Sequence, residues 1–166
     1  LFNKKILVGI TGGISAYKSI FLVRLLIQTG AQVKVVLSPS AHNFVSPLVL
    51  SVLSKNKVFS SFTNEEKIWN NHVELGLWAD LIIIAPSTAN TIAKLACGIC
   101  DNLLLAVVLS ARCPIFIAPA MDHDMYLNKI TQDNIKKIKK NGIMVIDVES
   151  GELASGLTGF GRLKEP

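Results

Sequence analysis

The chain has 166 residues, of which 50% are hydrophobic and 17% charged, a composition that excludes an intrinsically disordered polypeptide and predicts one domain over residues 1–166. Its longest unbroken apolar runs, Leu103–Leu109 and Ile115–Met121, are far shorter than the about 20 residues of a membrane-spanning helix, so no membrane partner is expected. The net charge of +5 is spread along a chain with only 7% aromatic residues, which argues against a nucleic-acid partner.

The N-terminal quarter of the chain has the pattern of a strand–helix–strand unit. Residues 4–10 are a short β-branched run that predicts a strand, and Thr11–Gly13 predicts a glycine turn. The periodic apolar stretch Ile14–Leu26 predicts a helix, which Gly30 is expected to end. Residues Gln32–Leu37 then predict the second strand.

Strands and helices continue to alternate through the rest of the chain. Residues 38–71 are mixed in polarity with short helical patterns, and the wholly apolar run 81–85 predicts a strand that is buried on both faces. The remaining expected elements are helices over 88–97 and 101–110, a strand over 114–118, a helix over 131–140 with Ile135 and Ile138 inward and its lysines in solvent, and a strand over 144–146. This order predicts a three-layer α/β fold, a Rossmann-like or flavodoxin-like parallel sheet with helices on both faces.

The three cysteines are not expected to bind a metal. Cys97 and Cys100 have the spacing of a redox or zinc motif, but no second pair of ligands completes a set. They are expected to be small core residues of a tightly packed helix. An odd number of cysteines without a secretory signal favours a reducing cytoplasm.

The tail, residues 148–166, is rich in glycine and differs from the rest of the chain. It is expected to be a mobile substrate flap or, equally, a frayed terminus.

Three strand ends are the places to look for chemistry, because ligands of open parallel sheets bind beyond the carboxyl ends of the strands. The first, Gly9–Ser15, suits a phosphate cradle but matches neither common glycine-rich fingerprint, so a plain tight turn explains it equally well. The second, Ala85–Thr91, supplies three hydroxyls and the Asn90 amide, which is more than helix capping explains. A mononucleotide shared between these two ends is the natural inference.

Five segments, in matching order, resemble the flavin-dependent cysteine decarboxylase family. They are Gly9–Lys18, His72–Asp80, Ala85–Thr91, Gly98–Leu103 and Pro119–Tyr126. Together they look most like the branch that acts on 4′-phosphopantothenoylcysteine. The resemblance implies an FMN-binding domain that decarboxylates the cysteine group of this phosphorylated conjugate to give 4′-phosphopantetheine in coenzyme A biosynthesis. In the bifunctional members of that branch, a synthase domain follows.

The resemblance also implies where the cofactor and substrate bind. FMN would lie at a subunit boundary of a homotrimer, or of a higher oligomer of trimers, against Gly12, Gly13, Ile14, Ser38, Ser40, Phe44, Thr88, Ala89, Asn90, Thr91 and Ala120. It implies catalytic roles for His72, Asp122 and Ser155 and substrate contacts from Asp122, Met125 and Ala154. In such enzymes the flavin oxidises the cysteine group of the substrate. A neutral imidazole, such as that of His72, can accept the proton of the substrate thiol.

Two positions depart from the family pattern. Asp122 stands where the family has an asparagine that contacts the substrate carboxylate, and an ionised Asp122 would repel that carboxylate. Ser155 stands where many members carry the cysteine that protonates an enethiol intermediate, and serine is a far weaker acid. Three interpretations of Ser155 remain open: another group supplies this proton, the reaction stops at the enethiol, or the reductive half of the reaction is lost.

Three other functions remain open at this stage. One is a peptidyl-cysteine decarboxylase that releases an enethiol, although the glycine and arginine pattern of Gly159–Leu163 fits it poorly. The second is a flavin prenyltransferase, which His72 and the Pro119–Tyr126 motif argue against. The third is a non-catalytic flavin-binding regulatory subunit, which the presence of His72 disfavours.

Overall fold

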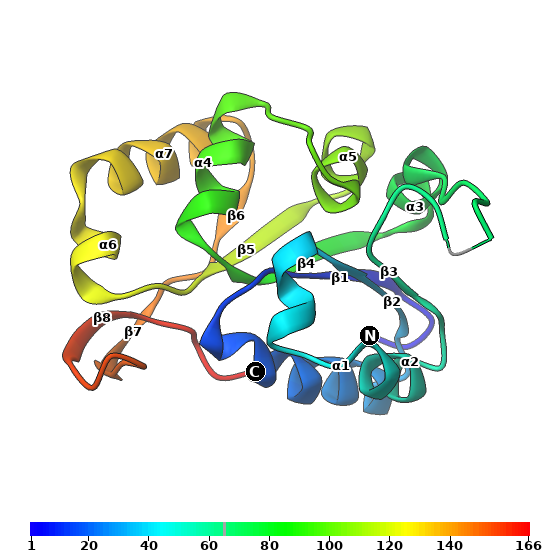
Figure 1. Cartoon of the computed structure of the whole chain (residues 1–166), viewed down its shortest axis with the longest axis horizontal. Coiled ribbons are helices and arrows are strands. Elements are labelled where there is room, and N and C mark those ends of the chain that lie inside the picture. The colour runs from blue at the N-terminus through cyan, green and yellow to red at the C-terminus, as the bar shows by residue number, and fades with distance from the viewer. Residues whose placement is uncertain (65) are drawn as a thin grey trace.

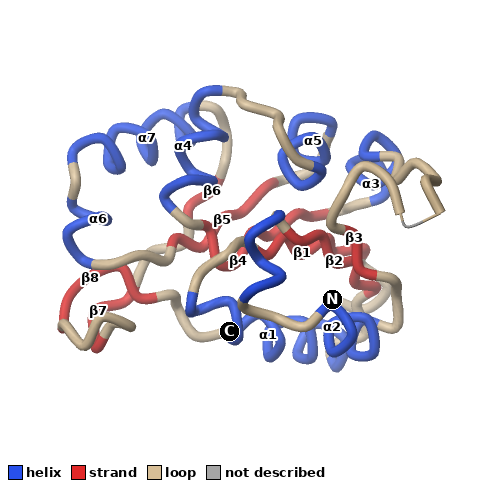
Figure 2. The backbone as a smooth tube through the Cα atoms, in the orientation of Figure 1, coloured by secondary structure: helices blue, strands red, loops and turns tan. Residues whose placement is uncertain are grey.

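A parallel sheet forms the centre of the fold. The computed structural model describes residues 1–64 and 66–166, and within them the sheet has the strand order β3-β2-β1-β4-β5-β6. Its strands are β1 (Lys5–Ile10), β2 (Gln32–Leu37), β3 (Val58–Phe59), β4 (Leu81–Ser87), β5 (Ile115–Pro119) and β6 (Met144–Val145). Helices cover both of its faces (Figures 1 and 2). The predicted three-layer, Rossmann-like α/β class is therefore confirmed.

The helices divide between the two faces of the sheet. Below it in Figure 1 lie α1 (Lys18–Gln28) and α2 (Pro47–Ser54), and above it lie α4 (Ala89–Cys97), α5 (Leu103–Ser110) and α7 (Lys129–Lys140). The shorter elements are the 3₁₀ helices η1 (Ile14–Tyr17) and η2 (Pro39–Asn43) and the α-helices α3 (His72–Trp78) and α6 (His123–Leu127).

Alternation along the central strands fills one apolar core on each side of the sheet. In β1, Ile6, Val8 and Ile10 join the core under α1 and α2, whereas Leu7 joins the core under α4 and α5. In β4, Ile82 and Ile84 point into the α4–α5 core and are fully buried. Successive side chains of a strand point to opposite faces, so a central strand with helices on both sides reads as one continuous apolar run.

The sequence placed most elements within a few residues. The second strand has the expected bounds, Gln32–Leu37, and Gly30, which follows α1, has a φ of +83°. Ile135 and Ile138 are the buried residues of α7, as expected. The helix expected over Ile14–Leu26 is instead a 3₁₀ turn followed by α1. The sequence missed β3, which lies in the stretch 38–71 of mixed polarity, and the five-residue helix α6.

The expectation that Cys97 and Cys100 are core residues is wrong. Both are exposed, because α4 ends at Cys97 and the chain then turns into the loop that leads to α5. Cys113 packs partly buried against the α4–α5 core, and this burial raises the pKa of its thiol.

The C-terminal segment 148–166 contains an antiparallel hairpin, of β7 (Glu149–Glu152) and β8 (Thr158–Arg162). The hairpin lies beside α6, at the left of Figure 1. Within the described ranges, no helix has the length and apolar character that crossing a bilayer requires.

Candidate active site

A cavity of about 670 Å³ lies at the carboxyl ends of β1, β4 and β5. Among the expected site residues, those that line it are Gly12, Gly13, Ile14, Ser40, Thr88, Ala89, Asn90, Ala120, Asp122, Met125, Ala154 and Ser155. The expected residues outside its lining are Ser38, Phe44, His72 and Thr91. The sequence did not anticipate the lining residues Tyr17, Lys18, Glu152, Arg162 and Leu163. Three strand ends thus meet where an open parallel sheet binds its ligands.

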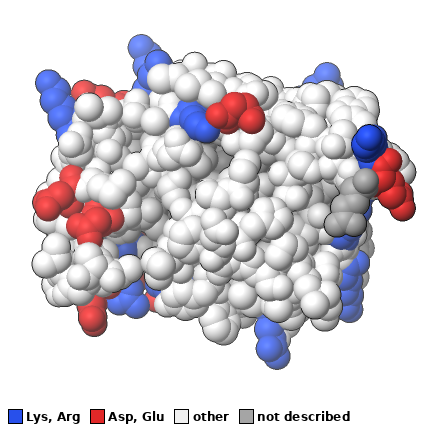
Figure 3. Space-filling model, viewed as in Figure 1, with Lys and Arg blue, Asp and Glu red and all other residues white. Residues whose placement is uncertain are grey.

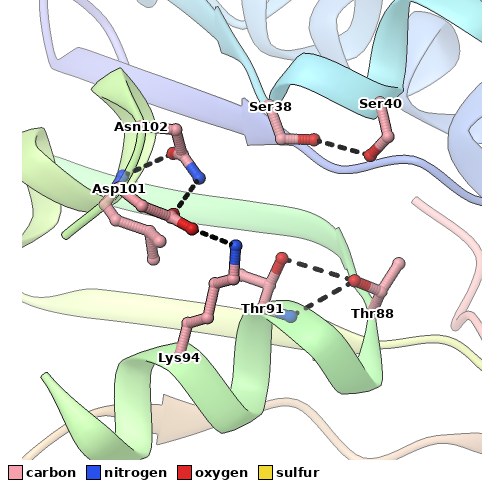
Figure 4. Close-up of polar contacts among 8 residues, drawn as sticks. Ser38, Ser40, Thr88, Thr91, Lys94, Asp101 and Asn102 are labelled. Carbon is pink, nitrogen blue, oxygen red and sulfur yellow. Dashed lines mark hydrogen bonds and ion pairs between the residues drawn. The ribbon is translucent and has the colours of Figure 1, made fainter. Parts of the chain in front are cut away.

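The glycine turn after β1 packs tightly against the start of η2. A Cβ atom on Gly12 would lie 2.7 Å from Cβ and 2.9 Å from the backbone carbonyl carbon of Ser40, so only glycine fits there. Gly13 has more space, since its nearest neighbour would be 3.6 Å away on Thr88. Ser38 lies behind Ser40, buried, with its hydroxyl 3.4 Å from the Ser40 hydroxyl (Figure 4).

Two buried hydroxyls tie the first and second strand ends together. Thr11 Oγ1 donates to the Pro86 carbonyl at 2.7 Å and accepts from the Thr88 amide at 3.2 Å. Ser19 Oγ donates to the Ala85 carbonyl at 2.6 Å. These bonds join segments up to 77 residues apart and fix the glycine turn against the start of α4.

Thr91, which is expected to contact the cofactor, lies beside the residue that caps α4. Thr88 begins α4 as its N-cap, and its hydroxyl accepts from the Thr91 amide at 3.4 Å (Figure 4). The Thr88 and Thr91 hydroxyls are themselves 3.3 Å apart, and Thr91 is buried. This capping arrangement leaves Thr88, Ala89 and Asn90 to face the cavity.

An ion pair fixes the loop between α4 and α5. Lys94 Nζ lies 2.5 Å from Asp101 Oδ2, and this hydrogen bond is the main reason why the pKa of Asp101 is lowered (Figure 4). Asn102 donates to Asp101 at 3.1 Å and accepts from the Leu105 amide at 3.1 Å, which caps α5.

The hairpin is held against α6 by backbone and imidazole contacts. The Met121 amide donates to the Gly161 carbonyl at 3.0 Å, and the Phe160 amide donates to His123 Nδ1 at 2.9 Å. The His123 ring also stacks on Phe160, with ring centroids 6.2 Å apart. Through these contacts the hairpin forms one wall of the cavity.

The two residues that depart from the family pattern are hydrogen-bonded to each other. Ser155 lies in the turn between β7 and β8, and its hydroxyl donates to Oδ2 of Asp122 at the start of α6. Asp122 makes no side-chain bond to the amides of its own helix. Its carboxylate is therefore turned toward the hairpin and the cavity.

A buried cation holds the end of the chain against α1. Lys18 is only 5% exposed, and its Nζ donates to the Leu163 carbonyl at 3.0 Å and to Glu165 Oε1 at 2.6 Å. Arg162 donates to the same Glu165 oxygen at 3.0 Å. A buried ammonium requires such partners, so the two cations and Glu165 together fix the residues that follow β8.

Acidic pH is expected to loosen this attachment. The hydrogen bond from Lys18 is the main reason why the pKa of Glu165 is lowered. A carboxyl with a lowered folded-state pKa stabilises the fold above its unfolded pKa, and this stabilisation is lost as the pH falls through the folded pKa. Hydrogen-exchange protection over residues 158–166 should therefore fall between about pH 7 and about pH 3.

The matched variant is Glu165→Gln, which should give low protection at both pH values. The exposed Asp147→Asn change should leave the pH dependence as in the parent protein. Unchanged protection of the parent protein down to about pH 3 would show that the Lys18–Glu165 pair does not hold this segment.

His72 lies away from the cavity of its own chain. It begins α3, whose N-cap Asn71 accepts from the amides of Val73 and Glu74 at 3.1 and 3.2 Å. Its ring meets Phe62 and Trp69 edge-on at centroid distances of 6.0 and 5.9 Å. Nδ1 is buried and has no hydrogen-bond partner among the described residues. In Figure 1, α3 and the α6–hairpin region stand at opposite ends of the molecule.

Curated relatives match the whole chain or most of it. The coenzyme A biosynthesis bifunctional protein CoaBC of Haemophilus influenzae is 47% identical over 100% of this chain and 42% of its own length. A cysteine/cysteine sulfinic acid decarboxylase from an unknown prokaryotic organism is 58% identical over 74% of this chain and 34% of its own length. The chain thus spans about two fifths or less of the length of these relatives.

Solved structures share the fold over nearly its full extent. A cysteine-to-serine mutant of PPC decarboxylase, complexed with pantothenoylaminoethenethiol, has a TM-score of 0.90 at 32% identity and covers 99% of this chain and 92% of that one. The FMN-dependent cysteine decarboxylase SpaF has a TM-score of 0.82 at 29% identity over 95% of this chain and 89% of that one.

The relatives and the structures agree with the resemblance to flavin-dependent cysteine decarboxylases. The family described as Flavoprotein matches residues 1–166, without a gap at either end of the chain. The resemblance inferred from the sequence is confirmed, and the chain belongs to the Flavoprotein family.

Proposed function

We propose that this chain is an FMN-dependent phosphopantothenoylcysteine decarboxylase. It converts the cysteine group of 4′-phosphopantothenoylcysteine into that of 4′-phosphopantetheine, a step of coenzyme A biosynthesis. The observation that carries the proposal is the cavity at three strand ends, lined by most of the residues that the family resemblance implies. The CoaBC relatives and the PPC decarboxylase structure support this substrate. A cytoplasmic location follows from a phosphorylated, membrane-impermeant substrate.

The residues around the cavity fit FMN. Gly12 lies so close to Ser40 that no side chain fits there, and Gly12 and Gly13 lie between the end of β1 and the start of η1, where a glycine turn can bind a phosphate. Gly13, Ser40, Thr88 and Asn90 add open backbone, hydroxyl and amide groups to the lining. Bound there, FMN supplies the oxidising power that prepares the cysteine carbon for loss of carbon dioxide.

The hairpin serves as the substrate flap in this proposal. Ala154, Ser155 and Glu152 line the cavity from the hairpin, opposite Met125 of α6. With the flap docked, the substrate cysteine is held between α6 and the β7–β8 turn, and water is kept from the reacting carbon. The docking contacts of Phe160 and Gly161 with α6 set the position of this wall.

A neighbouring subunit completes the site, and we propose a homotrimer or an oligomer of trimers. His72 lies outside the cavity of its own chain, so its imidazole could take part in proton transfer only at the cavity of another subunit. The large apolar side chains Ile14, Tyr17 and Phe21 are 63%, 50% and 57% exposed on η1 and α1, and Trp69 is 55% exposed near His72. Figure 3 shows a broad uncharged centre on the face it presents. Exposed apolar surface of this kind is typical of a subunit interface.

The test is carbon dioxide release from phosphopantothenoylcysteine by the purified protein reconstituted with FMN. Release at a rate that depends on FMN is the expected result. The product mass decides the role of Ser155, since the saturated thiol and the enethiol differ by two hydrogens. We expect the saturated thiol, with a group other than Ser155 as the acid. A protein that binds FMN but releases no carbon dioxide from this substrate would contradict the proposal.

Free cysteine is a second candidate substrate. The relative with 58% identity is named for cysteine and cysteine sulfinic acid, and neither of these carries a pantothenoyl group. Asp122 lines the cavity, and its carboxylate favours this candidate. A negative carboxylate attracts the ammonium group of free cysteine, whereas the asparagine of the family pattern is neutral.

A further inference from the structure

The hairpin depends on α6 for hydrogen bonds at its outer edge. β7 and β8 form a two-stranded sheet of their own, so amides on the outer edge of β8 need acceptors outside the hairpin. The Phe160 amide has such an acceptor in Nδ1 of His123, the first residue of α6, at 2.9 Å. Together with the bond between Met121 and Gly161, this imidazole nitrogen connects the substrate flap to the rest of the fold.

The contact between His123 and β8 is close. A Cβ atom on Gly159 would lie 2.5 Å from Nδ1 and 2.6 Å from Cγ of His123, so only glycine lets the imidazole reach the Phe160 amide. The His123 ring stacks on the Phe160 ring with an angle of 23° between the two planes. Gly159 and Phe160 therefore hold the imidazole in the orientation that directs Nδ1 at the amide.

The hydrogen bond requires the neutral form of His123. A backbone amide can only donate, so Nδ1 must accept, and the proton of the neutral ring is on Nε2. A second proton on the ring would occupy Nδ1, and two N–H groups would then face each other without an acceptor between them. Docking of the hairpin and protonation of His123 therefore oppose each other.

Other charged groups lie on the elements around His123. They are Asp122 and Asp124 on α6, Glu149 and Glu152 on β7, Arg162 on β8, and Lys129 and Asp133 on α7. Side chains of these types ordinarily titrate outside the range from about pH 8 to about pH 5.5. Glu165 stays ionised in this range, because its hydrogen bond with Lys18 lowers its pKa. The other two histidines of the chain, His42 and His72, lie on η2 and α3.

We infer that His123 is a positioning residue that keeps the substrate flap docked while its imidazole is neutral and releases the flap when the imidazole is protonated. The inference rests on the proposed decarboxylation, in which the flap holds the substrate against α6. His123 is not among the residues that line the cavity, so it acts through the position of the hairpin and not on the reacting atoms. Acidification therefore weakens substrate binding through this residue.

Amide hydrogen exchange of the FMN-loaded protein tests the inference without turnover. The protection factor of the Phe160 amide should fall about tenfold from about pH 8 to about pH 5.5, the effect of one lost hydrogen bond over the range in which an imidazole titrates. The exposed His42→Asn change is the matched control and should leave this fall intact.

Two variants of His123 separate its hydrogen bond from its stacking. His123→Asn keeps an acceptor near the position of Nδ1 that does not titrate, so protection of the Phe160 amide should stay high at both pH values. His123→Phe keeps an aromatic ring against Phe160 but has no acceptor, so protection should be low at both pH values.

Kinetics provide the second readout. From about pH 8 to about pH 5.5, KM for phosphopantothenoylcysteine should rise about tenfold more in the parent protein than in His123→Asn, whereas kcat should change equally in the two proteins. The phosphate of the substrate also titrates in this range, but it affects both proteins alike. An equal rise of KM in both proteins would contradict the role of His123.

The exchange experiment has outcomes that decide for or against the inference. Constant protection in the parent protein, or the same fall in His123→Asn as in the parent, would overturn it. Constant low protection in His123→Asn would still assign the pH dependence to His123. Absence of FMN binding or of carbon dioxide release would refute the proposed function, whereas carbon dioxide release with pH-independent protection would refute only the role of His123.

Discussion

Replacing His72 with asparagine is expected to lower kcat for decarboxylation by about two to four orders of magnitude, the usual contribution of a general acid or base. The imidazole rests edge-on against Phe62 and Trp69 with its Nδ1 buried, so these two aromatic rings set its orientation. Carbon dioxide release at saturating substrate measures the effect, and the flavin absorbance confirms that FMN is retained. The exposed His42→Asn change is the matched control.

Mixing two inactive variants should restore activity if His72 serves the cavity of a neighbouring subunit. The partner variant is Gly12→Ala, which is expected to exclude FMN because of its contact with Ser40. Unfolding and refolding the two variants together should yield about a quarter of the parental activity, since this share of sites combines an intact cavity with an intact neighbouring His72.

Two results would contradict this arrangement. Full activity of His72→Asn would leave His72 a packing residue between two aromatic rings. Loss of activity in His72→Asn without recovery in the mixed protein would contradict a site that is shared between subunits. That site is expected because α3 and the α6–hairpin region lie at opposite ends of the fold.

Replacing Gly161 with alanine is expected to destabilise the protein by about 2 to 6 kcal/mol, through backbone strain of about 1–3 kcal/mol and overpacking of about 1–3 kcal/mol. Gly161 has a φ of +116°, and an added Cβ would overlap the carbonyl oxygen of Met121 and lie 3.3 Å from its carbon. The same peptide accepts a hydrogen bond from the Met121 amide, so β8 cannot move away without losing that bond. Urea unfolding measures the change.

Gly156→Ala separates the two contributions. Gly156 has a φ of +83° in the same hairpin, but a Cβ there would meet no atom within 4 Å. Its cost should be about 1–2 kcal/mol, that of the left-handed backbone alone. Equal destabilisation by the two changes would show that the Gly161–Met121 contact does not constrain the hairpin.

Local sequence signals identified part of the cavity lining for a clear physical reason. The residues Gly12, Gly13, Thr88 and Asn90 directly follow strands whose apolar runs are easy to recognise, and they line the cavity as expected. Thr91 belongs to the same motif but is buried next to the Thr88 cap and lies outside the lining, and nothing in the motif distinguishes a buried hydroxyl from a lining one. Cys97 and Cys100 were expected in the core but are exposed. A sequence pattern predicts that a helix is present more reliably than it predicts the residue at which the helix ends.

The local sequence pattern did not predict contacts between residues that are far apart in the chain. Lys18 lies in a recognised segment, but its partners Leu163 and Glu165 are 145 and 147 residues away. A lysine in an amphipathic helix is expected in solvent, and only the docking of the C-terminal segment buries this one. Asp122 and Ser155 were both singled out, yet the bond between them joins residues 33 apart and depends on how the hairpin packs on α6.

The sequence by itself determined most of the longer secondary elements, the parallel α/β class and the strand ends that border the cavity. These follow from periodicity and turn residues, which are local properties that each segment carries alone. The tertiary structure decided the rest: that three strand ends form one cavity, that Lys18 and Arg162 converge on Glu165, and that His72 lies outside its own chain's cavity. The reason is that a side chain's partner across the fold is set by strand order and hairpin docking, and no local period encodes either.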